Sequence, residues 1–185
     1  MVGRLARQAQ PMLSATHEEP CMRIKRILVP IDFSLDSLHA LSQVRELAKV
    51  LWAELLLLHV VEPAYRADGS DVYVILPEGA VLLEEQMRAA EAHLVRIGAR
   101  LKTRSHRVRI CVKRGSPSKV IVDTAQGSGC DLIAMGTHGR TGLSRMLIGS
   151  VAAKVTRGAS CPVLTVRRAA ERRTKRGKMA GRRQA

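Results

Sequence analysis

The chain has 185 residues, of which 46% are hydrophobic and only 2% aromatic, and its formal net charge is +15. Its four cysteines form no C-x-x-C pair and no Cys/His group with zinc spacing. This excludes a disulfide framework or a zinc finger and favours a reducing compartment. The first ten residues lack an apolar signal core, and no apolar run is long enough to cross a bilayer, so we expect a cytoplasmic protein.

The basic excess is concentrated at the C-terminal end. Residues 167–185 carry nine basic side chains and one acidic side chain. We therefore expect a disordered N-terminal extension at 1–22, a folded domain at 23–168 and a disordered basic tail at 169–185. An anionic partner for this tail, nucleic acid included, is one hypothesis that the charge raises. Met12 and Met22 are alternative translation starts to Met1.

Short apolar runs alternate with amphipathic segments in the central part of the chain. The predicted strands are residues 26–31, 55–61, 107–112, 131–135 and 162–166. The predicted helices begin after the N-cap Ser34, run through 83–101, extend from Ser116-Pro117 to near Gly127, and cover 150–157. A polar loop containing Pro63, Gly69 and Pro77 precedes the second helix. Strands separated by helices predict an α/β fold with an open parallel sheet covered on both faces.

The glycine-rich segment 136–150, which follows the fourth predicted strand, is the strongest candidate for chemistry. Its glycines allow backbone amides to approach an anion closely, and Gly149-Ser150 stands at a helix N-terminus, where free N–H groups attract phosphate. Arg140 and Arg145 add positive charge. The alternative is a long loop whose glycines serve only its turns.

Three strand ends are expected to meet this loop, because ligands of open parallel sheets bind at the carboxyl ends of the strands. The first strand ends at Asp32, the second at His59-Val60 and the fourth at Met135-Gly136. The carboxylate of Asp32 can accept hydrogen bonds from a ribose or a base, or it can serve only to cap the next helix. His59 is expected to be a structural histidine.

Three segments of the chain resemble the universal stress protein family. They are the opening Ile27-Leu28-Val29-Pro30-Ile31-Asp32-Phe33-Ser34, the run Leu57-Leu58-His59-Val60 and the ending Cys161-Pro162-Val163-Leu164-Thr165-Val166. The loop matches the family's ATP-binding pattern Gly-x2-Gly-x9-Gly-Ser at Gly136, Gly139, Gly149 and Ser150. The resemblance covers about residues 24–167.

This resemblance implies a Rossmann-like sheet of order 3-2-1-4-5, similar to that of the adenine nucleotide alpha hydrolases, and a homodimer formed through the fifth strand, Pro162 to Val166. It further implies that the chain binds ATP, with Mg²⁺, and serves as a stress-response or signalling module with little or no turnover. The residues expected at ATP are Pro30, Asp32, Val60, Met135, Gly136, His138, Gly139, Gly149, Ser150 and Val151. For His138, a phosphate or backbone contact is favoured over a role as a catalytic base.

Two other function classes stay open. A slow ATP-hydrolysing or kinase-like enzyme is one, although the sequence has neither a Walker loop nor the kinase signature set. A nucleic-acid-binding protein acting through the basic tail is the other, although no aromatic residue interleaves the tail's charges for base stacking. A flavodoxin relative is disfavoured, since its phosphate loop would follow the first strand.

Overall fold

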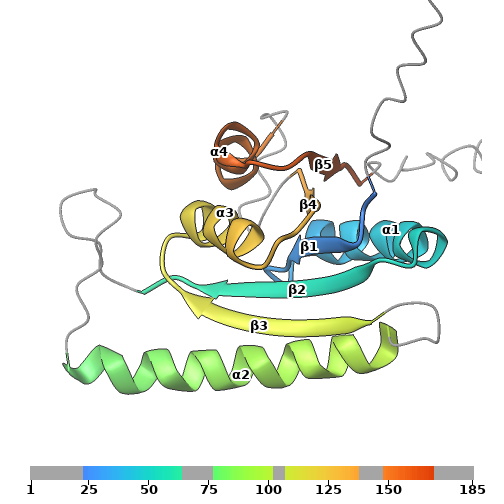
Figure 1. Cartoon of the computed structure of the whole chain (residues 1–185). Coiled ribbons are helices and arrows are strands. Elements are labelled where there is room, and N and C mark those ends of the chain that lie inside the picture. Colours follow the sequence, from blue (N-terminus) through green and yellow to red (C-terminus); the bar gives the residue numbers. More distant parts are fainter. Residues whose placement is uncertain (1–22, 64–76, 102–106, 138–147, 169–185) are drawn as a thin grey trace, which may run out of the picture.

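The computed structural model describes residues 23–63, 77–101, 107–137 and 148–168 (Figure 1). Within these residues no helix is long and apolar enough to cross a membrane. The expected N-terminal extension and basic tail lie outside them.

The strands form one parallel sheet, and its order β3-β2-β1-β4-β5 confirms the expected topology. The strands are β1 (Arg26–Pro30), β2 (Glu54–Val61), β3 (Val108–Arg114), β4 (Leu132–Gly136) and β5 (Val163–Val166). β3 continues beyond the predicted strand because Lys113 and Arg114 pair with Val60 and Val61 of β2. Their charge hid this extension in the sequence, since an edge strand can carry charged side chains.

Four helices cover the sheet: α1 (Leu35–Leu51), α2 (Pro77–Leu101), α3 (Pro117–Gly127) and α4 (Ser150–Gly158). One buried cluster joins α1 and α2 to the sheet, and a second joins α3 and α4 to its other face (Figure 1). Alternate residues of β2 supply the two clusters, with Leu55 and Leu57 facing α1 and α2, and Leu56 and Leu58 facing α3 and α4. This double burial explains why the strand sequences are apolar throughout.

The helix starts follow local capping chemistry. Ser34 is the N-cap of α1, because its Oγ accepts a hydrogen bond from the Ser37 amide at 3.2 Å. Ser116 and Pro117 occupy the N-cap and first helical position of α3, as predicted. The expectation that Pro77 belongs to a loop is wrong: Pro77 is the first residue of α2. A proline fits there because the first turn of a helix needs no amide hydrogen bond from it.

Candidate functional site

A cavity of about 760 Å³ opens at the carboxyl edge of the sheet. Its floor is made by the ends of β1, β2 and β4, and its walls come from the starts of α3 and α4 and from the middle of α2. The lining residues on the sheet side are Pro30, Ile31, Asp32, Phe33, Leu58, His59, Val60, Val61, Glu62, Met135, Gly136 and Thr137. Those from the helices and their first turns are Ser37, Gln86, Ala89, Ala90, His93, Pro117, Ile121, Gly149, Ser150, Val151 and Ala152.

The cavity brings together most of the residues singled out in the sequence. The lining includes Pro30, Asp32, Val60, Met135, Gly136, Gly149, Ser150 and Val151. His138 and Gly139 lie outside the described residues, as do Arg140 and Arg145. The three strand ends that the parallel topology predicted to converge therefore do converge.

Asp32 both lines the cavity and organises the turn into α1. Its Oδ1 accepts hydrogen bonds from the Ser34 amide at 3.0 Å and from the Ser34 hydroxyl at 2.6 Å. Ser34, in turn, caps α1. The two sequence hypotheses for Asp32 are thus compatible, because Asp32 supports the cap of α1 through Ser34 and also lines the cavity.

Thr137 holds both ends of the glycine-rich segment. Its amide donates to Val166 O at 3.1 Å, and its carbonyl accepts from the Gly149 amide at 2.7 Å. The first bond attaches the end of β4 to β5, and the second brings the start of α4 back to the end of β4. The two ends of the glycine-rich segment therefore meet at Thr137, beside the cavity.

The N-terminus of α4 faces this cavity with its first turn. Gly149 is the N-cap at φ −67° and ψ 157°, and the first backbone hydrogen bond of the helix runs from Ala153 N to Gly149 O at 2.9 Å. The amides of Ser150, Val151 and Ala152 precede that bond, so they have no carbonyl partner within the helix. Such amides, together with the helix dipole, attract a phosphate group.

The cavity extends over both faces of the sheet. Val60 and Val151 pack with the α3/α4 cluster, whereas Phe33 packs with the two clusters on the α1/α2 face. On that second face, the ring of Phe33 stacks on His59 and on His93 of α2. The α3/α4 side is therefore an apolar pocket next to the α4 amides, and the α1/α2 side is closed by stacked rings.

His59 is structural, as expected. It is 5% exposed, and its Nδ1 lies 2.6 Å from Ile31 O. A carbonyl oxygen only accepts, so Nδ1 carries the proton and donates it. This bond ties β2 to the end of β1 directly beneath the cavity.

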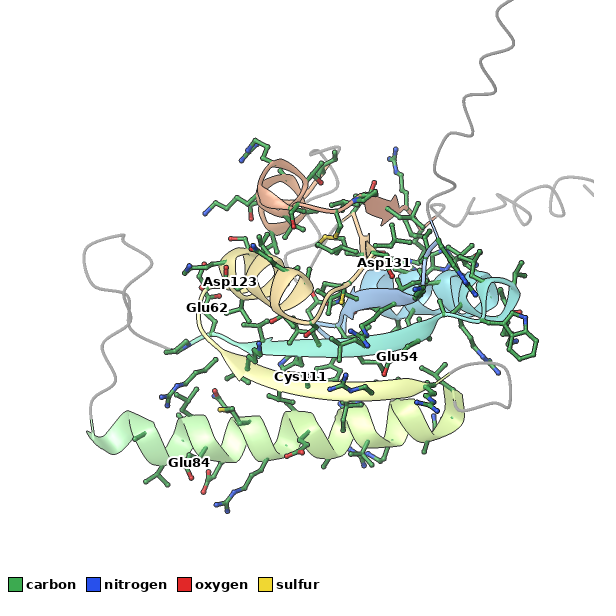
Figure 2. All side chains as sticks on the ribbon, in the orientation of Figure 1. Glu54, Glu62, Glu84, Cys111, Asp123 and Asp131 are labelled. Atoms are coloured by element: carbon green, nitrogen blue, oxygen red, sulfur yellow. The ribbon has the colours of Figure 1, made fainter. Side chains whose placement is uncertain are left out.

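The acidic residues at the amino edge of the sheet have structural partners far from the cavity. Asp131 accepts from the amides of Lys25 and Arg26 at 2.7 and 2.9 Å, and Glu54 accepts from Arg26 Nε at 2.6 Å. Figure 2 shows Glu54 at the start of β2 and Glu62 at its opposite end, the carboxyl edge. Among the lining residues, Asp32 and Glu62 are the two carboxylates, and the described part of the chain holds no group of three His, Cys, Asp or Glu residues suited to a metal ion.

Sequence reasoning missed the contribution of α2 to the cavity. Four residues of α2 line the cavity because α2 packs across β2 and β3, and a local sequence pattern does not reveal this packing. They are Gln86, Ala89, Ala90 and His93. Phe33 and Thr137 were also missed as lining residues, although each adjoins a residue of a recognised motif, and that adjacency was the available signal.

Comparison with known proteins agrees with this geometry. The model of the universal stress protein family matches residues 23–167. The chain belongs to the universal stress protein family. Universal stress protein MJ0531 of Methanocaldococcus jannaschii is 34% identical over 151 residues, covering 78% of this chain and 82% of that protein.

Solved structures of the family share the fold. Protein MJ0577 of the same organism superposes with a TM-score of 0.69 at 30% identity, covering 79% of this chain and 97% of the other. A universal stress protein solved in complex with cAMP is 24% identical, with a TM-score of 0.50 and coverage of 78% and 98%. At that identity the second likeness shows the fold alone.

Proposed function

We propose that this universal stress protein binds ATP in the cavity at the carboxyl edge of its sheet. The observation that carries the proposal is the junction of an apolar pocket, the Asp32 carboxylate and the N-terminus of α4, whose N-cap glycine has no side chain, within one cavity. These three features match the base, the ribose and the phosphates of a nucleotide in that order.

The base fits the α3/α4 side of the cavity. Val60, Met135 and Val151 supply apolar surface there, and Pro30 lines the same cavity at the end of β1. An aromatic purine gains by leaving water for such a surface. At about 760 Å³, the cavity is within the range of roughly 300–1,000 Å³ that small-molecule sites occupy.

The sugar and the phosphates follow from the polar groups. Asp32 is held by Ser34 with its carboxylate on the wall, so it can accept a ribose hydroxyl. The amides of Ser150, Val151 and Ala152, which have no carbonyl partner within α4, are the proposed donors to the phosphate chain. Gly149 would line the phosphate site beside them, and Gly136, His138 and Gly139 are the other residues that we assign to it. Mg²⁺ would enter with the phosphates, since it usually keeps several waters and needs few protein carboxylates.

We further propose that turnover is low and that the protein acts as a nucleotide-dependent signalling module. Rapid phosphoryl transfer requires a positioned metal carboxylate and a group that orients the nucleophile. Among the residues that line the cavity, Asp32 and Glu62 are the two carboxylates, and Oδ1 of Asp32 accepts two hydrogen bonds from Ser34. A slow ATPase stays the alternative. Steady turnover above about 1 s⁻¹ that a loop mutation abolishes would contradict low turnover and establish an enzyme.

The test is to identify the small molecule released when the purified protein is denatured, and then to titrate the emptied protein calorimetrically. ATP, cAMP, GTP and sodium tripolyphosphate separate the base from the phosphate contribution. We expect ATP to bind more tightly than GTP and than tripolyphosphate. Tighter binding of cAMP than of ATP would assign the site to a cyclic nucleotide, and no heat with any of the four would refute a nucleotide site.

A further inference from the structure

Phe33 has a backbone conformation that a phenylalanine rarely adopts. Its φ angle is +64°, in the left-handed region, and it lies between the cavity carboxylate Asp32 and the helix cap Ser34. For a residue with a side chain this region is unfavourable, because Cβ comes too close to the following carbonyl oxygen. Neighbouring contacts must therefore hold Phe33 in it.

Two histidine rings supply these contacts. Phe33 stacks on His59 with ring centroids 4.5 Å apart and planes 30° apart, and on His93 with centroids 4.4 Å apart and planes 12° apart. The phenyl ring is thus sandwiched between an imidazole from β2 and an imidazole from α2. Such ring pairs are stabilising beyond the area they bury, so they can offset the unfavourable left-handed backbone.

The two histidines differ in how firmly they are held. His59 is buried and its Nδ1 donates to Ile31 O at 2.6 Å, so its ring is part of the sheet. His93 is exposed on α2 and lines the cavity. Removing the His93 ring therefore opens one side of the sandwich without leaving a hole in the core.

The conformation of Phe33 determines where the Asp32 carboxylate lies. The amide and hydroxyl of Ser34 reach Asp32 Oδ1 across the single residue between them. If Phe33 turned to an ordinary negative φ, the plane of its peptide with Asp32 would rotate relative to Ser34, and this short turn would open. Asp32 would then lose the two bonds that orient it.

We propose that His93 is a positioning residue for nucleotide binding, which holds Phe33 in its left-handed conformation and thereby keeps the Asp32 carboxylate directed at the ribose. This inference rests on the proposed ATP site and adds a residue of α2 to it. The His93 ring acts on the protein before the nucleotide binds. Without this ring, only a fraction of the molecules has the Asp32 carboxylate oriented for binding. The apparent dissociation constant for ATP then rises by the inverse of that fraction.

The test measures ATP affinity by titration calorimetry in the full-length protein, four single variants and one double variant. His93→Ala removes the ring, His93→Phe keeps a stacking ring, and Val95→Ala is a matched control on an exposed position of the same helix. We expect His93→Ala to raise the dissociation constant about threefold to tenfold, and His93→Phe and Val95→Ala to stay within about twofold of the wild type. The melting temperature of the unliganded His93→Ala protein should fall by only a few degrees, because the ring is exposed.

The fourth variant, Asp32→Asn, tests the route of the effect. It keeps an oxygen for Ser34 and weakens ATP binding by itself, and His93→Ala added to it should cause little further loss. Weak binding by His93→Phe would point to a direct imidazole contact and overturn the positioning role. An equal loss from His93→Ala with and without Asp32 would overturn it as well. Absence of ATP binding by the wild type would refute both the proposed function and this inference. An unchanged ATP affinity in His93→Ala would refute the inference alone.

Discussion

A Cβ atom added at Gly136 would lie 3.0 Å from both the backbone carbonyl carbon and the carbonyl oxygen of Asp36. The end of β4 and the first turn of α1 are therefore so close that a side chain at this position would force the backbone of α1 to shift by a few tenths of an ångström. In the sequence, Gly136 is the first glycine of the phosphate pattern. In the structure it also permits the packing that brings β4, α1 and the Asp32 turn together.

We predict that Gly136→Ala destabilises the unliganded protein by about 1–3 kcal/mol, the cost of overpacking against backbone that cannot move aside cheaply. Urea unfolding measures this. Gly127→Ala is the matched control, because a Cβ at Gly127, in the last turn of α3, meets nothing within 4 Å. Equal stability of the two variants would show that β4 and α1 separate easily.

The regular elements could be predicted because their causes are local. Ser34 and the pair Ser116-Pro117 carry cap chemistry, and the apolar runs of β2 and β4 are buried on both faces. Pro77 was misassigned because a proline can either end a loop or begin a helix, and the pattern of neighbouring apolar residues did not decide between them.

The site was predictable only in part, for a different physical reason. The carboxyl ends of parallel strands meet at one edge of the sheet, so Asp32, Val60 and Met135 could be placed at that edge from the sequence alone. The stacking of Phe33 with His93 depends instead on the angle at which α2 crosses the sheet. It also needs a left-handed φ that phenylalanine disfavours, so no local rule anticipates it.

The buried thiol of Cys130 predicts a loss of stability in alkali. Burial raises the pKa of Cys130 from 9.0 to about 11. Below about pH 9 the thiol is neutral in both the folded and the unfolded chain, and its contribution to stability is intact. Between about pH 9 and 11 the thiol ionises in the unfolded chain but stays protonated in the folded chain. The free energy of unfolding therefore falls as the pH rises. The free energy of unfolding of Cys130→Ala, measured with urea at pH 8 and pH 10.5, should decline less than that of the wild type; parallel declines would contradict this.

The residues of the two edge strands, β3 and β5, predict which edge of the sheet forms a dimer. β3 carries the exposed charges Arg109, Lys113 and Arg114, which discourage pairing, whereas β5 has no charged residue and its Leu164 is 40% exposed. We propose a homodimer through β5, and we expect Leu164→Lys to be monomeric at micromolar concentration by light scattering. Val95→Lys, at an exposed apolar position on α2, should stay dimeric. A monomeric wild type would contradict the proposal.

Deletion of residues 169–185 should leave both the melting temperature and the ATP affinity unchanged. The last described residue, Arg168, donates from Nε to Asp36 Oδ1 at 3.1 Å, and both side chains are partly exposed. Such a pair contributes about 0–1 kcal/mol, so deletion from Arg168 onward should cost little more. A loss of many degrees in the shorter deletion would show that the basic segment packs on the domain. Binding of an anionic polymer, if the segment provides it, should disappear with the deletion and weaken steeply with salt.

Gly149→Val tests whether the start of α4 holds the phosphates. Gly149 has φ −67° and ψ 157°, which a valine adopts without strain, so the backbone does not require a glycine here. Any loss of ATP binding must then come from the side chain itself, which would occupy the space in front of the first helical amides. We expect at least a tenfold rise in the dissociation constant for ATP, about 1.4 kcal/mol, and a comparable loss for tripolyphosphate, which lacks the base.

The melting temperature separates this effect from a damaged fold. Wild-type protein at an ATP concentration about a hundred times the dissociation constant should gain roughly 2.7 kcal/mol of stability. Gly149→Val should lose most of that gain, while its stability without ATP changes by only about 1 kcal/mol, the typical effect of changing an N-cap residue. Gly139→Val, in the part of the loop outside the described residues, should behave in the same way if its amide also faces the phosphates. Gly149→Ala provides the graded control, because a methyl group blocks the amides less than an isopropyl group does. If the ATP affinity is the same in the wild type, Gly149→Ala and Gly149→Val, the phosphates do not bind at the start of α4. The nucleotide site would then lose its main support.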